Sequence, residues 1–436
     1  MKKGLQDIIV TLFSRVLSMA IALGTQSALA WLLGREGRGQ YAVCLVFASL
    51  FTVILTFGMD WAANYSVASK KMSLNESLTF SLIYVSIICL IGCPLAYYLT
   101  FLPISFFQKA PHGAFTLSIF WIAAMMLFNF NNAQLRGLQK FNFLAAATIS
   151  QSLFVLVGTI LGVKMLRMGV LSPIAAGIVG SIIFCIATLI WLKREYELSW
   201  EYPAWEKIRD EVHYGMRTFW GTFGMLANAQ IGTILLAFFV DEGQLGLFAV
   251  AMGFLAQIIT LSDVVGAVVQ PRVSADEEGR PELVAMCSRL VVALSVMACL
   301  SILVFSRPLV SILFSKEFMP VVPLLFILTP GIVLRCAGKS LFPYFNGTNH
   351  PGVVSIATFL NFVVNILLLI LLVPKYALAG AAFAAVGGYA VSTVFLVICF
   401  YKLSRFPVNS IFIIRWKDLK LIRDIVWKIS VFQARQ

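Results

Sequence analysis

Charged residues are scarce in this chain of 436 residues, since Asp, Glu, Lys and Arg together make up only 12% of it. Soluble domains carry about 25%, so the sequence excludes a soluble globular protein. A glycine-rich phosphate loop is also missing, which excludes a nucleotide-driven pump on this chain. No polar segment is long enough for a separate catalytic domain, so we predict that the protein is not an enzyme.

Metal-binding patterns are missing as well. The three histidines are scattered through predicted loops, and no HExxH pair occurs. The eight cysteines lie inside apolar segments or at their edges, without the spacing of metal ligands. We therefore expect free cysteines that pack as small apolar residues, and neither a metal site nor a cofactor.

Apolar residues, by contrast, are abundant, at 60% of the chain with a mean hydropathy of +0.90. A membrane helix needs about 20 consecutive apolar residues. Twelve such segments predict an all-α polytopic membrane protein with about twelve transmembrane helices. They are 10–33, 41–62, 78–100, 116–135, 143–166, 170–192, 218–240, 247–269, 290–313, 321–341, 353–373 and 378–401.

The order of the segments predicts two six-helix lobes, 1–192 and 218–401, with an interfacial linker at 193–217. Lys and Arg exceed Asp and Glu, 33 to 20, and they concentrate in the loops on one side. Because such loops are typically cytoplasmic, we expect both termini in the cytoplasm and no nucleic acid as a partner. The tail at 402–436 has the spacing of a basic amphipathic helix lying on anionic lipids; a solvated disordered tail is the alternative.

A short motif recurs in the two predicted lobes. The stretches 33–43 and 240–250 both end in Gly-x-Tyr/Phe-Ala-Val, and their glycines, Gly39 and Gly246, are 207 residues apart. A second echo pairs the Arg136-Gly137 turn with the Asn346-Gly347 turn, 210 residues apart. Two echoes in the same order indicate a duplicated bundle, and six helices per half predict parallel repeats.

Charged side chains inside predicted spans are costly, so they mark candidate functional sites. The charged set comprises Arg15, Arg136, Arg217, Arg335, Lys339, Asp60 and Asp263. Its excess of cations predicts an anionic solute, and the planar fork of arginine matches phosphate best. For Arg15, Arg136 and Arg217, which lie near predicted cytoplasmic ends, snorkelling to lipid headgroups is the alternative.

Polar residues also line up on several predicted helices. Thr52, Thr56, Asp60 and Asn64 recur every four residues, which predicts one polar face ending in a carboxylate. Pairing of Asp60 with Lys70 or Lys71 is the alternative for that carboxylate. The amides that could face a polar cavity are Asn64, Asn132, Asn228, Gln257, Asn361 and Asn365. Hydrogen bonding between helices is the alternative for them.

Three turns carry a family resemblance that covers nearly the whole chain. They are Leu33-Gly34-Arg35-Glu36-Gly37-Arg38-Gly39-Gln40-Tyr41-Ala42, Arg136-Gly137-Leu138-Gln139 and Asn346-Gly347-Thr348-Asn349. With the six-plus-six plan, the chain resembles a Wzx-type polysaccharide flippase of the multidrug/oligosaccharidyl-lipid/polysaccharide exporter superfamily. The resemblance implies a V-shaped pair of lobes in the bacterial cytoplasmic (inner) membrane. It also implies alternating-access transport of a polyprenyl-diphosphate-linked sugar repeat unit to the outer leaflet, for surface polysaccharide (O-antigen) biosynthesis.

On this hypothesis the residues take three roles. Arg335, Arg15, Arg217 and Lys339 hold the diphosphate, and the amides Asn64, Asn132, Asn228, Gln257, Asn361 and Asn365 meet the sugars. Asp60 and Asp263 couple transport to a proton or sodium gradient. The expected partners are the lipid-linked glycan, anionic lipids at the tail, and other membrane proteins of polysaccharide assembly.

Three other functions stay open. The nearest is a lipid II flippase, although family members of that kind usually have fourteen spans rather than twelve. A cation-coupled multidrug antiporter of the same superfamily often has a carboxylate in its first helix, where this chain has Arg15. A lipid-linked sugar polymerase or ligase would need a large outer loop with catalytic residues. The longest predicted outer loop, 101–115, has only Lys109 and His112 as ionisable groups.

Overall fold

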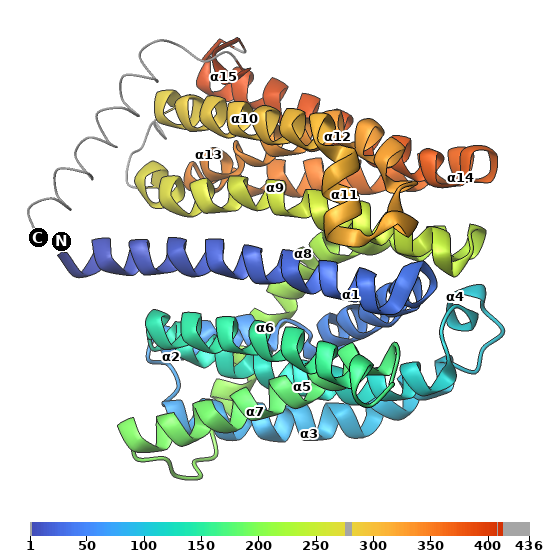
Figure 1. Ribbon diagram of the computed structural model, residues 1–436. Coiled ribbons are helices and arrows are strands. Elements are labelled where there is room, and N and C mark those ends of the chain that lie inside the picture. The colour runs from blue at the N-terminus through green and yellow to red at the C-terminus, as the bar shows by residue number, and fades with distance from the viewer. Residues whose placement is uncertain (1, 275–280, 408, 413–436) are drawn as a thin grey trace, which may run out of the picture. The chain divides into compact units, whose positions relative to one another are not determined.

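The computed structural model describes residues 2–274, 281–407 and 409–412, and every element in these ranges is a helix (Figure 1). The elements are α1 (Lys2–Thr56), α2 (Met59–Ala68), α3 (Leu74–Leu99), α4 (Ser105–Gln108), α5 (His112–Gly137), α6 (Phe141–Lys164), α7 (Leu171–Glu195), α8 (Trp205–Phe239), α9 (Glu242–Ser274), α10 (Pro281–Val304), α11 (Ser306–Phe314), the 3-10 turn η1 (Lys316–Phe318), α12 (Val321–Lys339), α13 (Phe342–Gly347), α14 (Pro351–Ser404) and α15 (Asn409–Phe412). The predicted all-α class is confirmed.

Ten helices in the described residues are long and apolar enough to cross a membrane. Two of them are double, because a residue with non-helical backbone angles interrupts each. Gly34 breaks α1 at φ 66°, and Ala377 breaks α14 at φ 45°. Each of the two therefore supplies two spans, which gives the predicted number of about twelve.

The chain forms two compact units. Unit 1 comprises Met1–Val250 and Val310–Val321, and unit 2 comprises Ala251–Leu309 and Val322–Gln436. In unit 1, α1 packs against α6, α5 packs against α3 and α7, and α2 and α8 pack on each other (Figure 1). The first stretch of unit 1 ends at residue 250, and α8 belongs to this unit, where it packs against α1 and α2.

The expected linker at 193–217 is mostly helical. α7 continues to Glu195, and α8 begins at Trp205, so only nine residues lie between the two helices. The acidic residue Glu206 in the first turn of α8 favours this early start, since it complements the helix dipole. Next to this segment, Ser73 and Glu76 form a capping box that fixes the start of α3.

The prediction of one continuous polar face along the second span is wrong, because the helix is interrupted. Phe57 and Gly58 have positive φ angles of 49° and 75°, so the helix stops at Thr56 and restarts as α2. Thr52 and Thr56 are buried before this break, whereas Asp60 and Asn64 lie on the separate helix α2.

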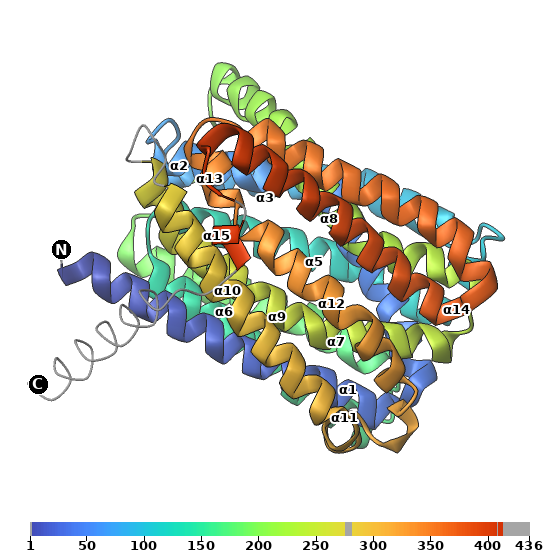
Figure 2. The same ribbon diagram turned by 90° about the horizontal axis from the view of Figure 1, so that it is seen from above.

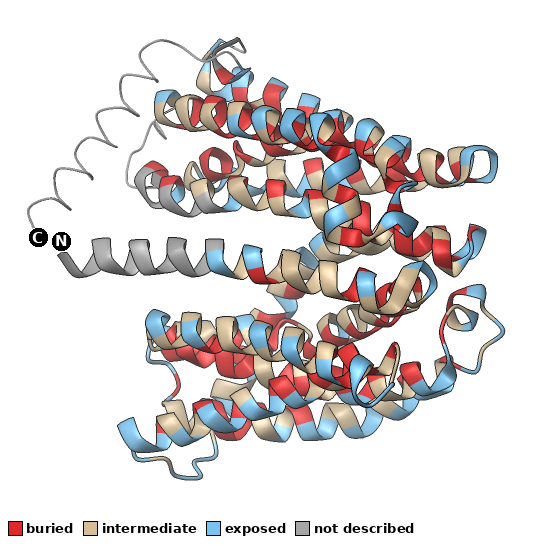
Figure 3. Cartoon of the chain, viewed as in Figure 1, coloured by how far each residue is buried: buried red, intermediate tan, exposed pale blue. Residues whose placement is uncertain are grey.

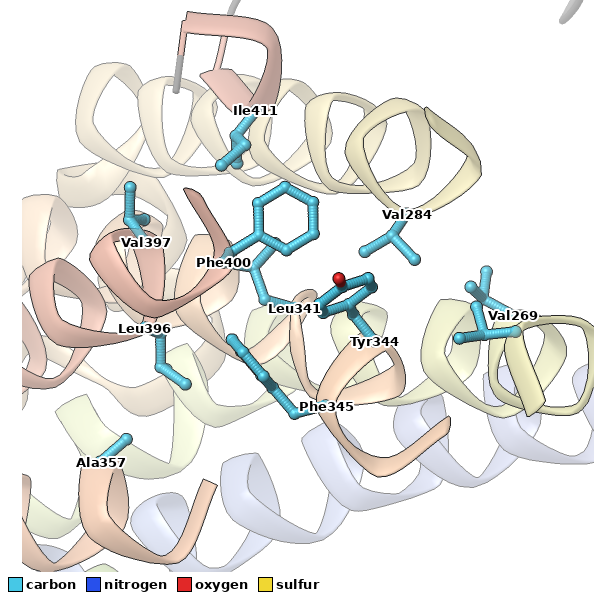
Figure 4. Packing of buried hydrophobic residues seen from close by; sticks show 11 residues of the cluster. Val269, Val284, Leu341, Tyr344, Phe345, Ala357, Leu396, Val397, Phe400 and Ile411 are labelled. Carbon is cyan, nitrogen blue, oxygen red and sulfur yellow. The ribbon is translucent and has the colours of Figure 1, made fainter. Parts of the chain in front are cut away.

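Unit 2 has a hydrophobic core at the ends of its helices. Val284 of α10, Tyr344 and Phe345 of α13, and Phe400 of α14 meet there, and Ile411 of α15 closes the cluster (Figure 4). The rings of Tyr344 and Phe400 lie edge to face with centroids 4.8 Å apart. α14 turns back on itself at Ala377, so its two halves run side by side (Figure 2).

Exposed residues occur along most of the helices (Figure 3), and many of them are large and apolar. On α3, Leu90 is 77% exposed and Ile91 is 66% exposed, while Leu78 and Val85 are buried. A helix that is apolar on both its buried and its exposed face suits hydrocarbon as its surroundings. The protein is a multi-pass membrane protein. The basic tail from residue 413 on lies outside the described residues.

Candidate functional site

The last two turns of α12 bring two predicted cations together in unit 2. Arg335 and Lys339 are four residues apart, so they share one face of the helix. The Arg335 guanidinium carbon lies 5.1 Å from the ring centroid of Tyr389, at cation–π distance. The Lys339 ammonium forms a salt bridge with Asp263 of α9, with Nζ 2.7 Å from Oδ1 and 2.8 Å from Oδ2.

Arg335 and Lys339 also line the same small cavity. Its volume is about 10 Å³, which is about the space of one water molecule. The hydroxyl-bearing residues Thr358, Ser392 and Thr393 complete its polar lining. The Thr393 hydroxyl donates a hydrogen bond to the Leu334 carbonyl, 2.8 Å away. In this conformation the cavity can hold water but no sugar.

A second group of predicted residues lies in unit 1 around Arg136. Its Nε donates to the carbonyl of Asn132, 3.2 Å away, and its guanidinium carbon lies 5.6 Å from the ring centroid of Trp61. Asp60 and Arg136 attract each other electrostatically. Arg136 is thus a cation whose charge acts on Asp60. Asn64 lies on α2, where its carbonyl packs against Gly137.

Of the remaining predicted residues, Arg217 and Asn228 lie on α8 and Gln257 lies on α9. Arg217 is exposed on α8, and Asn228 is buried on the same helix. The Gln257 amide donates within its own helix to the Gly253 carbonyl, 3.5 Å away. The side chain of Arg15 lies outside the described residues.

Asn361 and Asn365 lie between the two halves of α14. They are 1% and 6% exposed. A Cβ on Gly388 would lie 3.0 Å from the Asn361 carbonyl oxygen and 3.3 Å from the Asn365 Cβ. Positions this crowded hold the two helix halves together, which agrees with the packing alternative for this amide pair.

Three buried charged residues were not predicted as site residues from the sequence: Glu211, Arg38 and Arg289, which is 5% exposed on α10. Glu211 of α8 is 2% exposed, and neither of its carboxylate oxygens has a hydrogen-bond partner. Arg38 is 3% exposed; it hydrogen-bonds to the Gln26 side chain and lies 5.5 Å from the ring centroid of Tyr41. The sequence does contain a sign of the burial of Glu211. Glu211, Gly215 and Phe219 are spaced four residues apart, so they share one face of α8, and all three are buried.

The two echoed motifs meet each other in unit 1. A Cβ on Gly39 would collide with the carbonyl of Glu242, and a Cβ on Gly246 would collide with the carbonyl of Arg35. Gly246 lies 207 residues after Gly39, and Glu242 lies 207 residues after Arg35. The contact is therefore reciprocal, because the glycine of each copy packs against the carbonyl of the residue four positions before the glycine of the other copy.

A similar close approach joins α2 to α8. A Cβ on Gly58 would lie 2.8 Å from the hydroxyl of Thr218. The rings of Phe57 and Phe219 stack with centroids 4.4 Å apart, and those of Tyr65 and Tyr214 stack at 4.5 Å with an angle of 3° between their planes. Unit 1 thus has two close contacts between glycines of the first 60 residues and the segment from 215 to 246.

Two relatives align with the chain. Agl15 of Haloferax volcanii, a probable low-salt glycan biosynthesis flippase, is 23% identical over 214 residues, which is 48% of this chain and 45% of Agl15. The alignment thus spans less than half of that protein. An uncharacterized membrane protein of Methanocaldococcus jannaschii is 24% identical over 388 residues, covering 82% of this chain and 76% of the relative.

Solved structures share the fold. The lipid II flippase MurJ in an inward closed conformation superposes with a TM-score of 0.73 at 18% identity, covering 99% of both chains. An inward-facing multidrug resistance MATE family transporter of the MOP superfamily gives 0.69 at 17% identity, covering 90% of this chain and 99% of the transporter. The family model described as polysaccharide biosynthesis protein matches residues 5–275. Because this match covers more than half of the sequence, the chain belongs to the polysaccharide biosynthesis protein family.

Proposed function

We propose that the protein is a transporter that flips a polyprenyl-diphosphate-linked oligosaccharide repeat unit from the inner to the outer leaflet of the cytoplasmic membrane. Its family, the flippase named among its relatives and its MurJ-like fold support this proposal. A hydrated, anionic headgroup must cross about 30 Å of hydrocarbon in such a reaction. The lipid tail can stay in the bilayer throughout.

The observation that carries the proposal is the pairing of Arg335 and Lys339 in one polar cavity. An arginine fork and an ammonium, four residues apart on one helix face, offer donors to both phosphates of a diphosphate. Threonine and serine hydroxyls beside them can bind the first sugar. The cavity must widen for this, so substrate entry requires a conformation other than the present one.

Asp263 supplies a route for ion coupling. It neutralises Lys339 through the salt bridge in this conformation. Protonation of Asp263, or binding of a sodium ion to it, would release Lys339 for the diphosphate. The substrate and the coupling ion would then compete for one lysine, and a gradient of the ion could drive transport.

Alternating access requires that each side of the protein can close. The reciprocal contact of Gly39 and Gly246 in unit 1 is a candidate closure for the side that the Lys and Arg distribution predicts to be external. With both termini in the cytoplasm, that closure keeps the outer leaflet out of reach while the headgroup enters from inside.

The test is deletion of the gene in its host, followed by complementation with wild type or Arg335→Ala. We expect loss of surface polysaccharide, accumulation of single lipid-linked repeat units on the cytoplasmic face, and rescue by wild type only. Arg335→Lys should rescue partly, and Lys375→Ala, which removes an exposed cation of α14, should rescue fully. Full rescue by Arg335→Ala at normal protein level would contradict the assignment.

The same experiment separates the rival functions. Repeat units that accumulate on the outer face would indicate a polymerase or ligase. Unchanged surface glycan together with altered sensitivity to cationic drugs would indicate an antiporter, whose fold this chain shares.

A further inference from the structure

Unit 1 contains a second polar cavity. Its lining shares no residue with the cavity at Arg335 and Lys339, which we call the α12 cluster. Its volume is about 710 Å³, within the range of about 300–1,000 Å³ that small-molecule sites occupy. Four segments bound it: the end of α2 with the turn after it, the first turn of α3, the end of α5, and the segment from Glu201 to the first turn of α8. Lys and Arg in these segments place the cavity on the predicted cytoplasmic face.

The two carboxylates of the cavity are already occupied. Glu76 accepts hydrogen bonds from the Lys207 ammonium, with Nζ 2.7 and 2.8 Å from its two oxygens, and from the Ser73 amide at 2.9 Å. Glu201 accepts from the side chains of Ser73, Asn75 and Ser199 at 2.8–3.0 Å. Because the oxygens of both carboxylates already accept hydrogen bonds from the protein, they are poor candidates for ligands of a metal ion.

The two other lysines of the cavity have no such partner. Lys70 and Lys71 are exposed, and within the described part of the chain neither forms an ion pair. The Lys71 ammonium lies 5.0 Å from the ring centroid of Tyr65, which limits how far it can swing. With Lys207 included, three lysines face two carboxylates, and the cavity has a net positive charge.

The backbone holds two side chains in the cavity at a cost. Lys70 and Gln139 both have a φ of 57°, in the left-handed region where glycine is favoured at the end of a helix. They follow α2 and α5, respectively, and both line the cavity. Lysine gains from the negative end of the α2 dipole, but glutamine has no such gain at the end of α5. Strain of this kind is concentrated at binding sites.

We propose that this cavity is a docking site for a phosphate-bearing headgroup, in which Lys70 and Lys71 bind the phosphate oxygens and Gln139 donates a further hydrogen bond. The inference rests on the proposed function only for the identity of the headgroup. A docked headgroup would be held at the cytoplasmic membrane surface before it reaches the α12 cluster. The same phosphate chemistry occurs in free pyrophosphate and in a lipid diphosphate.

The test uses the full chain in nanodiscs of neutral phosphatidylcholine. Pyrophosphate is titrated by calorimetry, and a long-chain prenyl diphosphate is titrated by native mass spectrometry. We expect Lys70→Gln/Lys71→Gln to weaken binding of the prenyl diphosphate by roughly tenfold or more. The matched control is Lys164→Gln/Arg167→Gln, two exposed cations on the predicted opposite face, which should bind as wild type does.

Comparing the pyrophosphate titration with the prenyl diphosphate titration also identifies the source of the phosphate. Weakened binding of both probes supports a site for any phosphate anion, and weakened binding of the lipid alone supports a site that needs the membrane-anchored form. Gln139→Gly, which relieves the left-handed strain, should raise the melting temperature and yet weaken binding about threefold. Unchanged binding of both probes to the double lysine variant would overturn the proposal.

A transport assay separates this inference from the proposed function. Arg335→Ala should stop flipping but leave pyrophosphate binding at Lys70 and Lys71 intact. If Arg335→Ala flips normally while the lysine variant loses binding, the role of α12 is wrong and the docking site stands. If the lysine variant binds normally while Arg335→Ala fails to flip, the docking site alone is wrong.

Discussion

Gly39 and Gly246 approach each other so closely that neither position has room for a side chain. A Cβ on Gly39 would lie 3.1 Å from the Gly246 nitrogen, and a Cβ on Gly246 would lie 3.0 Å from the Gly39 nitrogen. Even an alanine at either position would have to push the two chain segments apart. The two copies of the repeated motif therefore pack directly against each other.

This contact gives a prediction for the closed state. Gly39→Ala or Gly246→Ala should shift the protein towards a conformation in which the two turns separate. A cysteine placed at Arg35, whose carbonyl packs on Gly246, should then react faster with a membrane-impermeant maleimide in intact cells. Because the contact is reciprocal, the double variant should label little faster than either single variant.

The matched control is Gly113→Ala in the first turn of α5. A Cβ at Gly113 would meet no atom within 4 Å, so the labelling rate of the cysteine at position 35 should not change. An equal increase for Gly113→Ala would mean that the effect does not come from the glycine contact.

Much of this architecture could be predicted from the sequence because hydropathy reports directly which segments prefer hydrocarbon. What hydropathy missed is the break at Phe57 and Gly58, which interrupt a continuous apolar run. The reversal of α14 at Ala377 was expected, because it falls between the predicted segments 353–373 and 378–401, next to Pro374 and Lys375. A left-handed φ at a phenylalanine inside an apolar run has no local sequence pattern that would reveal it.

The candidate site was predictable only where its residues share one helix. Arg335 and Lys339 are four residues apart, and helix geometry alone places them together. Asp263 is 76 residues from Lys339 in sequence, so their salt bridge depends on how α9 packs against α12. Glu211 was assigned to a linker because charged neighbours lower the hydropathy there, yet α8 already begins at Trp205.

Glu201 gives a prediction for the dependence of stability on pH. Hydrogen bonds from Asn75, Ser199 and Ser73 hold the pKa of this exposed carboxyl below its ordinary value. A carboxyl whose pKa is lower in the folded protein stabilises it above the unfolded pKa, and this stabilisation is lost as the pH falls through the folded pKa. Glu201→Gln should therefore lower the melting temperature at neutral pH by at most a few degrees.

The difference in melting temperature between wild type and Glu201→Gln should close as the pH is lowered towards about 3. Differential scanning fluorimetry of the detergent-solubilised protein measures it. Glu206→Gln, at an exposed position of the first turn of α8, is the control and should show a smaller difference at neutral pH. A difference for Glu201→Gln that is constant over the whole pH range would show that the hydrogen bonds do not favour the ionised carboxylate.

Glu211 gives a prediction for stability at neutral pH. Its carboxylate is 2% exposed, and both oxygens lack hydrogen-bond partners, so an ionised form would be costly there. Glu211→Gln has nearly the same shape and carries no charge, and it should therefore raise the free energy of unfolding by about 1 kcal/mol or more. Chemical denaturation in detergent measures the change, and a loss of stability would mean that the carboxylate has a partner which the amide cannot replace.

The salt bridge between Asp263 and Lys339 gives a prediction for coupling. Asp263→Asn removes the charge that neutralises Lys339, so the ammonium is available to a diphosphate at any pH. The bridge is partly exposed, with the Asp263 side chain 44% accessible, so its loss should cost less than about 1 kcal/mol of stability. We therefore expect Asp263→Asn to keep its fold and to bind the lipid diphosphate at least as tightly as wild type. Flipping in proteoliposomes should no longer respond to an imposed proton or sodium gradient.

Lys339→Gln is the counterpart, because it removes the same salt bridge but also the cation, and it should weaken binding of the lipid diphosphate about tenfold. If Asp263→Asn still responds to the gradient as wild type does, the coupling carboxylate lies elsewhere, and Asp60 beside Arg136 becomes the next residue to test.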